Sequence, residues 1–274
     1  MTRAHIINRS TLPGLVGVTI VVAICLAALL APLVAPHGQG DLVGEVWAPI
    51  SDAALLGLDN LGRDMLSRLL YGGRITLFIA LAGTVLSFVI GCTLGLIAAV
   101  SGGWIDAAIA RVVEAVMALP PLICALVLLS VLGTSVPILI MTIATLASTR
   151  VFRLSRALGG DIVALDYFEA ARLRGETLTW LVGFEILPNI LAPLTTEFGL
   201  RLCSNFLLVA SLSFLGLGIQ PPLADWGSMV RENAVAIGFG GLAPLIPAVA
   251  IAIFAIGVNL AVDWSLALRS QQRD

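Results

Sequence analysis

The residues that could carry chemistry in this sequence are few, and most lie outside its long apolar runs. The chain has two histidines, His5 and His37, and neither lies within such a run. Glu197 and Arg201 do lie within one, at a spacing that lets them pair on one face of a helix. A charge in an apolar segment is by default a functional candidate, but a self-paired couple also serves structure, which we favour here. We expect no catalytic residue and no metal site.

Lysine is absent from the whole sequence. A G-x-x-x-x-G-K-[ST] phosphate loop therefore cannot occur, because that loop needs its lysine to reach the nucleotide phosphates. If ATP drives this protein, another chain must bind and hydrolyse it, and we expect no cofactor in this chain. The cysteines stand singly in apolar segments, which predicts small packed side chains rather than a disulfide framework: Cys25, Cys92, Cys124 and Cys203.

The composition is that of a membrane protein. Hydrophobic residues make up 59% of the chain and charged residues 12%, and the mean hydropathy is +1.04, which excludes a single soluble domain. A net charge of −2 without a basic patch gives no sign of nucleic acid as a partner. The apolar runs predict an all-α integral membrane protein with six transmembrane helices, near residues 11–36, 75–105, 108–132, 136–156, 190–218 and 242–262.

Local signals refine these spans. The first run is too long for the apolar core of a signal peptide, so we expect a retained anchor. Asp59-Asn60 can cap a short separate helix that lies on the membrane surface or plugs an opening. Pro120-Pro121 predicts a kink inside the third span. Three arginines are expected to close the fourth span: Arg150, Arg153 and Arg156.

A polar segment of helix–turn–helix length, residues 166–189, follows the fourth span. It reads DYFEAARLRGETLTWLVGFEILPN. Gly175 can adopt the positive φ that ends a short helix, and Pro188 suits the start of the next one. Two alanines let a helix face approach a partner closely. The segment resembles the cytoplasmic coupling loop, or "EAA" loop, of ABC-importer membrane subunits. That resemblance implies contact with an ATPase subunit through Glu169, Ala170, Ala171, Arg172, Gly175, Leu187 and Pro188.

Two further motifs support the same resemblance. LDNLGRDMLSRLLYGGRITL, at residues 58–77, resembles the GTDxxGRDxxSRLxxGxRxSL segment of the dipeptide, oligopeptide and nickel branch of ABC permeases. LSFLGLGIQPPLADWG, at residues 212–227, resembles the LSFLGLGxxxPxxxWG run of that branch. The resemblance places these residues toward the periplasm, on the receptor side: Gly62, Arg63, Asp64, Trp226 and Gly227. The chain departs from the branch pattern at Leu58, Leu173, Arg174, Glu185 and Val262.

The arginines also indicate an orientation. With the amino terminus inside, ten arginines, Arg150 among them, lie in the cytoplasm and four lie outside, which agrees with the positive-inside rule. With the resemblance, this implies a multi-pass protein of the bacterial inner membrane with both termini cytoplasmic. We divide the chain into an N-terminal tail, first transmembrane helix and periplasmic segment (1–74), an importer transmembrane core with its coupling loop (75–266) and a cytoplasmic tail (267–274).

The resemblance implies a type I ABC importer fold and a membrane-spanning permease subunit of an ATP-driven, binding-protein-dependent importer. Its implied partners are a homologous second permease, two ABC ATPase subunits that bind ATP, an extracytoplasmic solute-binding protein and membrane lipid. Di- or oligopeptides are the favoured substrates, and nickel or a metal chelate is the alternative in the same branch. An ion-coupled secondary transporter would need intramembrane carboxylates and a repeated half, and only Glu197 qualifies. An intramembrane enzyme would need a catalytic constellation among the spans.

Overall fold

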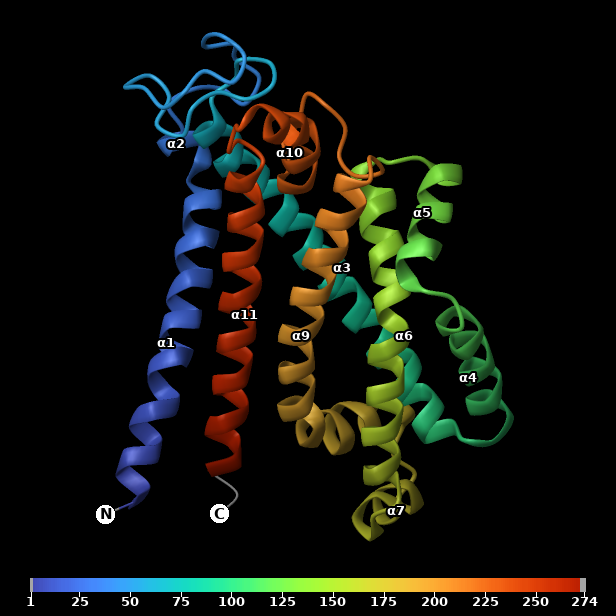
Figure 1. Cartoon of the computed structure of the whole chain (residues 1–274). Helices are drawn as coiled ribbons and strands as arrows, with labels where there is room; N and C mark the ends of the chain where they lie inside the picture. Colours follow the sequence, from blue (N-terminus) through green and yellow to red (C-terminus); the bar gives the residue numbers. More distant parts are fainter. Residues whose placement is uncertain (1, 272–274) are drawn as a thin grey trace.

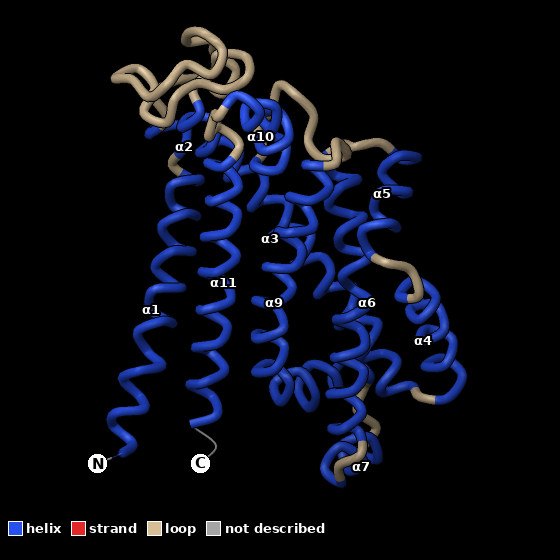
Figure 2. Tube along the Cα trace, in the orientation of Figure 1, coloured by secondary structure: helices blue, strands red, loops and turns tan. Residues whose placement is uncertain are grey.

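The computed structural model describes residues 2–271, with the side chains of residues 12–268, and this part of the chain is helical (Figure 2). The helices in order are α1 (Thr2–Leu29), α2 (Ala31–Val34), α3 (Met65–Ser101), α4 (Gly103–Met117), α5 (Pro121–Leu132), α6 (Val136–Val163), α7 (Asp166–Leu173), α8 (Leu178–Trp180), the π-helix η1 (Leu181–Ile186), α9 (Leu187–Phe214), α10 (Trp226–Asn233), the 3₁₀-helix η2 (Ala234–Phe239) and α11 (Leu245–Gln271). Between them, the described residues form only isolated β-bridges. The all-α prediction is confirmed.

Five helices in the described part of the chain are long and apolar enough to cross a membrane: Leu12–Leu29, Met65–Ser101, Val136–Val163, Leu178–Phe214 and Leu245–Leu268. Helices α4 and α5 complete the six predicted spans as one broken span, with a bend of 87° between them. Pro120 is extended, with φ −59° and ψ 128°, and Pro121 is the first residue of α5. Because prolines donate no backbone N–H, the predicted kink is instead a complete break.

Helix α3 runs without interruption from Met65, so the separate short helix predicted after Asp59-Asn60 is wrong. Asp64, and not Asp59, caps α3, because its Oδ2 accepts the backbone N–H of Ser67 at 2.9 Å. The carboxylate of Asp59 binds arginine side chains instead, as described below. Both aspartates suit a helix start by residue type, and long-range contacts decide between them.

Helix α6 extends past the predicted end of the fourth span, to Val163. Arg150, Arg153 and Arg156 therefore lie within the helix and do not close it, and Arg150 is the fifteenth of its 28 residues. Packing explains the extension, because a Cβ atom on Gly159 would lie 3.0 Å from the Leu96 side chain of α3. Contact with α3 holds the last turns of α6 in a helix where the polar sequence had indicated an end.

Helices α3 and α6 pack closely because glycines remove side chains from their interface. A Cβ atom on Gly91 would lie 2.6 Å from Cβ of Val151, and one on Gly95 would lie 2.7 Å from the carbonyl oxygen of Phe152. Figure 1 shows α3 crossing the bundle obliquely behind α9, while α1 lies alongside α11. Helix α3 is therefore in contact with α1, α6 and α9 and forms the centre of the bundle.

The remaining features gather at the two ends of this bundle (Figures 1 and 2). Both chain ends and α7 lie at one end. The long loop of residues 35–64 lies at the other end, over α2 and beside α10. The three motifs that were identified in the sequence are thereby sorted, with the Glu-Ala-Ala segment at one end and the Gly-Arg-Asp and Trp-Gly segments at the other.

Candidate functional sites at the two ends of the bundle

The Glu-Ala-Ala sequence folds as α7, an eight-residue helix. Glu169, Ala170 and Arg172 are exposed on it, whereas Ala171 has no accessible surface and Phe168 is 1% exposed. The prediction that both alanines form a face for a partner is therefore wrong for Ala171. Its small side chain serves packing inside this chain, and the outward face of α7 consists of the three exposed residues.

Phe168 and Ala171 fix α7 to the rest of the bundle. Their side chains join a buried apolar cluster from α3, η1 and α9: Leu96, Val100, Leu181, Ile186, Ile190 and Leu194. Half-buried residues of α6 pack against the same cluster. Burying a phenylalanine side chain contributes about 1.5–3 kcal/mol, so α7 does not move independently of the helices around it. The base of α7 is thus packed against residues of α3, α6 and α9.

Gly175 makes the turn that follows α7. Its φ is +83°, which confirms the predicted positive value. Its backbone N–H donates to the carbonyl oxygen of Arg172 at 3.0 Å. No atom lies within 4 Å of where a Cβ would stand, so the backbone conformation, and not a shortage of space, requires glycine here.

The chain returns to a helix earlier than predicted. The side-chain oxygen of Thr177 accepts the N–H of Trp180 at 3.3 Å and caps a helix that begins at Leu178 and continues through η1 into α9. Pro188 is exposed and Leu187 half-buried, and Pro188 stands in the first turn of α9, as predicted. Helix α9 nevertheless continues from η1 without a break, so Pro188 is not the start of a separate span. The wider π-helical turn before Pro188 accommodates its missing N–H. Figure 1 shows this part lying across the end of the bundle before α9 rises.

The segment also presents uncovered apolar side chains. Leu173, just before the Gly175 turn, is 82% exposed, and Phe184 on η1 is 69% exposed. Tyr167 and Leu178 are also exposed. Charged residues of the same segment surround them, and Arg174 reaches Glu176 only at 4.0 Å on the surface. Apolar groups on a polar, protruding segment are typical of a contact surface for another protein.

A buried ion cluster occupies the opposite end. Arg63 Nε lies 2.7 Å from Asp59 Oδ2, and its Nη2 lies 3.0 Å from Glu232 Oε2 of α10. Arg68 Nη1 contacts the same Asp59 oxygen and lies 3.0 Å from the same Glu232 oxygen. The backbone N–H of Asn60 donates to Oδ1 of Asn233 at 2.9 Å. These contacts attach the loop of residues 35–64 to α10.

The electrostatics of the cluster keep Asp59 ionised. Burial acts to raise its pKa, but the backbone N–H groups of Arg63 and Leu61 and the guanidinium of Arg68 outweigh burial and lower the pKa below its ordinary value. Gly62, between these groups, has a φ of +78°, and a Cβ there would overlap the carbonyl oxygen of Gly44. Only glycine fits this position.

The Trp-Gly motif holds α10 against α3 and α9. The indole Nε1 of Trp226 donates to the carbonyl oxygen of Leu69 at 2.7 Å. The indole ring packs edge-on against the ring of Phe206, with 5.9 Å between the ring centroids. A Cβ on Gly227 would overlap the carbonyl oxygen of Ala210 on α9. The motif therefore lets the backbones of α9 and α10 approach each other directly.

Replacing Gly227 with alanine should therefore destabilise the protein by about 1–3 kcal/mol, as for other overpacked sites. The added methyl group would push α10 from α9 and strain the ion cluster. The midpoint of thermal unfolding of the purified protein is the measurement. The control is Gly238→Ala in η2, where nothing lies within 4 Å of the new Cβ. Equal midpoints for the two variants would contradict this account.

All five residues that were predicted to face a receptor are buried: Gly62, Arg63, Asp64, Trp226 and Gly227. They build the outer end of the fold and do not themselves form its surface. The cluster also contains residues that sequence reasoning missed, namely Asp59, Arg68, Glu232 and Asn233. Asp59 and Arg68 lie inside the Gly-Arg-Asp motif, which was the available signal, whereas Glu232 stands 164 residues from Arg68.

The family described as "Binding-protein-dependent transport system inner membrane component" matches residues 91–272. The chain belongs to this family. It is thus a multi-pass inner-membrane permease, and the recognised resemblance is confirmed.

Named relatives extend the match over most of the chain. A di/tripeptide transport system permease protein, DppC, of Pseudomonas aeruginosa is 34% identical over 93% of this chain and 86% of its own length. A dipeptide transport system permease protein of Haemophilus influenzae is 33% identical over 93% of this chain and 88% of its own. A glutathione transport system permease protein, GsiD, of Pectobacterium atrosepticum is 33% identical over 78% of this chain and 71% of its own.

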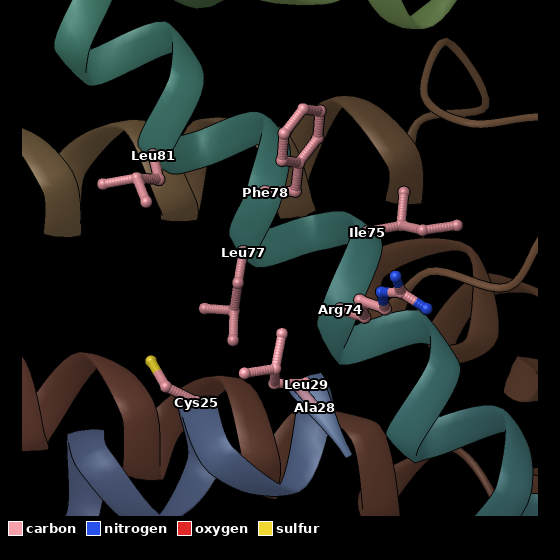
Figure 3. A pocket seen from close by; sticks show the side chains of 8 residues that line it. All are labelled: Cys25, Ala28, Leu29, Arg74, Ile75, Leu77, Phe78 and Leu81. Carbon is pink, nitrogen blue, oxygen red and sulfur yellow. The ribbon is translucent and has the colours of Figure 1, made fainter. Parts of the chain in front are cut away.

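One groove on this permease lies between α1 and α3 (Figure 3). It has a volume of about 590 Å³ and is lined by Cys25, Ala28, Leu29, Arg74, Ile75, Leu77, Phe78 and Leu81. Figure 3 shows Leu77 pointing across the groove toward Leu29. Apart from Arg74 these lining residues are uncharged and mostly apolar, which suits acyl chains or an apolar helix. We therefore do not place a transported polar solute here.

Proposed function

We propose that this chain is the membrane-spanning subunit of an ATP-driven importer of di- or oligopeptides. The observation that carries the proposal is α7, a protruding segment with exposed charged and apolar residues whose base is buried among three long helices. Such a segment can receive a mechanical displacement from an ATPase subunit. The peptide substrate is supported by relatives that are named as dipeptide, di/tripeptide and glutathione permeases.

Coupling would operate through the outward face of α7. Glu169, Ala170 and Arg172, with the turn at Gly175, would seat in an ATPase subunit, and the adjacent Leu173 would add apolar contact. Closure of two ATPase subunits would then displace α7 and, through Phe168, the ends of α3, α6 and α9. ATP must favour the outward-open arrangement over the inward-open one, since a ligand shifts an equilibrium only by its differential affinity.

The remaining assignments follow from this one. If α7 faces the ATPases, both termini lie in the cytoplasm, because they share its end of the bundle (Figure 1). The loop of residues 35–64 and α10 would then face the periplasm and the solute-binding protein. A homologous second permease would complete the passage, and ATP would be bound by the ATPase subunits and not by this chain.

The proposal is tested by determining whether ATP or the membrane potential drives uptake. The permease, reconstituted in proteoliposomes with its partner permease, ATPases and binding protein, should accumulate labelled dipeptide when ATP is present and the membrane potential is collapsed. Uptake should stop when ATP is depleted at constant potential. A secondary transporter predicts the reverse, because the potential supplies about 2.3 kcal/mol per charge per 100 mV. Uptake that follows the potential and ignores ATP would contradict the proposal.

A further inference from the structure

A second cavity, open to the surface of the bundle, lies where α5, α6 and α9 meet. It has a volume of about 300 Å³, and its lining combines polar side chains with apolar ones such as Leu146 and Leu208. The polar side chains that line it are Arg150, Arg201, Ser204, Asn205 and Ser211. None of these residues belongs to the α7 segment or to the ion cluster.

The two arginines lie at the middle of their helices. Arg150 is the fifteenth of 28 residues in α6, and Arg201 is the fifteenth of 28 in α9. At a rise of 1.5 Å per residue, each stands about 20 Å from either end of its helix. Helix α6 descends and α9 rises between the two ends of the bundle (Figure 1), and both arginines line the same cavity. The cavity therefore lies within the membrane-spanning part of the permease.

The exposure of Arg150 indicates the surroundings of the cavity between α5, α6 and α9. Its side chain is exposed, and among the described residues 12–268 it makes no ion pair. Arg201 differs, because its Nε lies 2.7 Å from Glu197 Oε1 on the same helix, with side-chain exposures of 15% and 18%. This pairing was predicted from the sequence and is confirmed. An unpaired guanidinium is costly against acyl chains, so the cavity face is suited to a hydrated passage between this chain and a second permease rather than to lipid.

The serines complete the chemistry of the cavity. The hydroxyl of Ser204 donates to the carbonyl oxygen of Leu200 at 2.9 Å, and that of Ser211 donates to Leu207 at 2.7 Å. Because both hydroxyl hydrogens are engaged within α9, the serine oxygens can only accept hydrogen bonds from a solute. The cavity thus offers two cationic donor groups beside a row of neutral acceptors.

We propose that this cavity is a transient binding site for the peptide during its passage, and this inference rests on the proposed function. Arg150 and Arg201 bind the C-terminal carboxylate, which a planar guanidinium can hold through two hydrogen bonds. The oxygens of Ser204 and Ser211 accept N–H groups of the peptide. Glu197 compensates part of the Arg201 charge, so the carboxylate is held weakly enough to be released.

The test uses the complete reconstituted importer and the variants Arg150→Gln and Arg201→Gln. Each should lower uptake of a free-acid dipeptide by about tenfold, the loss expected for about 1.4 kcal/mol of carboxylate binding. ATP hydrolysis stimulated by the loaded binding protein should stay close to wild type, because neither residue touches α7. The control is Arg153→Gln, an exposed arginine one turn further along α6 that lines a different cavity and should leave uptake unchanged.

Two comparisons separate binding from a purely structural role. With an amidated dipeptide that the binding protein also accepts, the same variants should change uptake little, because no carboxylate is present. The double variant Glu197→Gln/Arg201→Gln removes the ion pair without leaving an unpaired charge. If Arg201 only stabilised α9, this double variant would restore uptake, and that result would overturn the proposal. Under the binding proposal its uptake stays low.

The outcomes also distinguish this inference from the proposed function. Wild-type complex that fails to accumulate dipeptide would contradict the peptide assignment and the inference with it. Wild-type uptake combined with unaffected Arg150→Gln and Arg201→Gln variants would overturn the inference alone. Loss of free-acid uptake with retained amide uptake supports both.

Discussion

Replacing Gly175 with proline should abolish dipeptide uptake by the reconstituted importer while leaving the permease inserted and folded. Proline cannot adopt the φ of +83° that this turn requires, and it removes the N–H that donates to Arg172. It also disfavours the helical conformation of Arg174 before it. The outward face of α7 would change its orientation relative to α8. The movement of the ATPase subunits would then no longer be transmitted to the long helices. Uptake and receptor-stimulated ATP hydrolysis are measured at matched protein levels.

Two matched variants serve as controls for Gly175→Pro. Gly175→Asn should keep most of the uptake, because asparagine tolerates a positive φ better than other side chains. Gly183→Ala in η1 should be neutral, since nothing lies within 4 Å of its new Cβ and its φ is not positive. Full uptake by Gly175→Pro would contradict the coupling role of this segment. Ala170→Trp offers an independent test, because it alters the exposed face of α7 without altering the turn.

Replacing Asp59 with alanine should cost about 3–5 kcal/mol of stability, as expected when one partner of a buried ion pair is removed. Arg63 and Arg68 are 6% and 1% exposed, and without Asp59 they would share only Glu232. The loop of residues 35–64 would be held to α10 less firmly, through contacts such as the Asn60–Asn233 hydrogen bond. The thermal unfolding midpoint of the purified permease should fall steeply, with a matching loss of protein in the membrane.

Glu45→Ala is the control for Asp59→Ala, because Glu45 is exposed in the same loop. The dependence on pH gives a second check. Since the folded-state pKa of Asp59 is lowered, its stabilisation is present above the ordinary carboxyl pKa of about 3.9 and is lost as the pH falls through the lower, folded-state value. The gap between wild type and variant should thus be constant at neutral pH and shrink only in strong acid. An unchanged midpoint at neutral pH would show that Asp59 does not hold the cluster together.

Hydropathy alone predicted the helical class and the approximate position of each span, because an apolar run of sufficient length has few alternatives to a membrane helix. The ends of the helices were less predictable. Asp59 and Asp64 are equally good cap residues by type, and the choice depends on Arg68 and on Glu232, which is far along the chain. The continuation of α6 past Arg156 depends in the same way on packing against the glycines of α3.

In the candidate sites, too, the features that depend on nearby residues were predicted correctly, and those that depend on distant residues were not. The positive φ of Gly175 and the pairing of Glu197 with Arg201 depend on residues within one turn, and both predictions were correct. The burial of Ala171 depends on Leu181 and Ile186, which reach it only because the chain folds back after Gly175. Arg150 was expected at the end of a span, and its place beside Arg201 follows from the antiparallel arrangement of α6 and α9.

Because the chain is synthesised from its amino terminus, the ion cluster can be completed only late in synthesis. Arg63 and Arg68 are synthesised long before Glu232, which is 164 residues beyond Arg68. At about 5–20 residues per second, roughly 10–30 s pass before the last acidic partner emerges. During biogenesis Asp59 is the only acidic partner of the two arginines from this cluster, and the loop of residues 35–64 cannot yet attach to α10. A copy that is truncated before α10 never closes this end, so a membrane protease has a physical basis for removing unfinished chains and sparing complete ones.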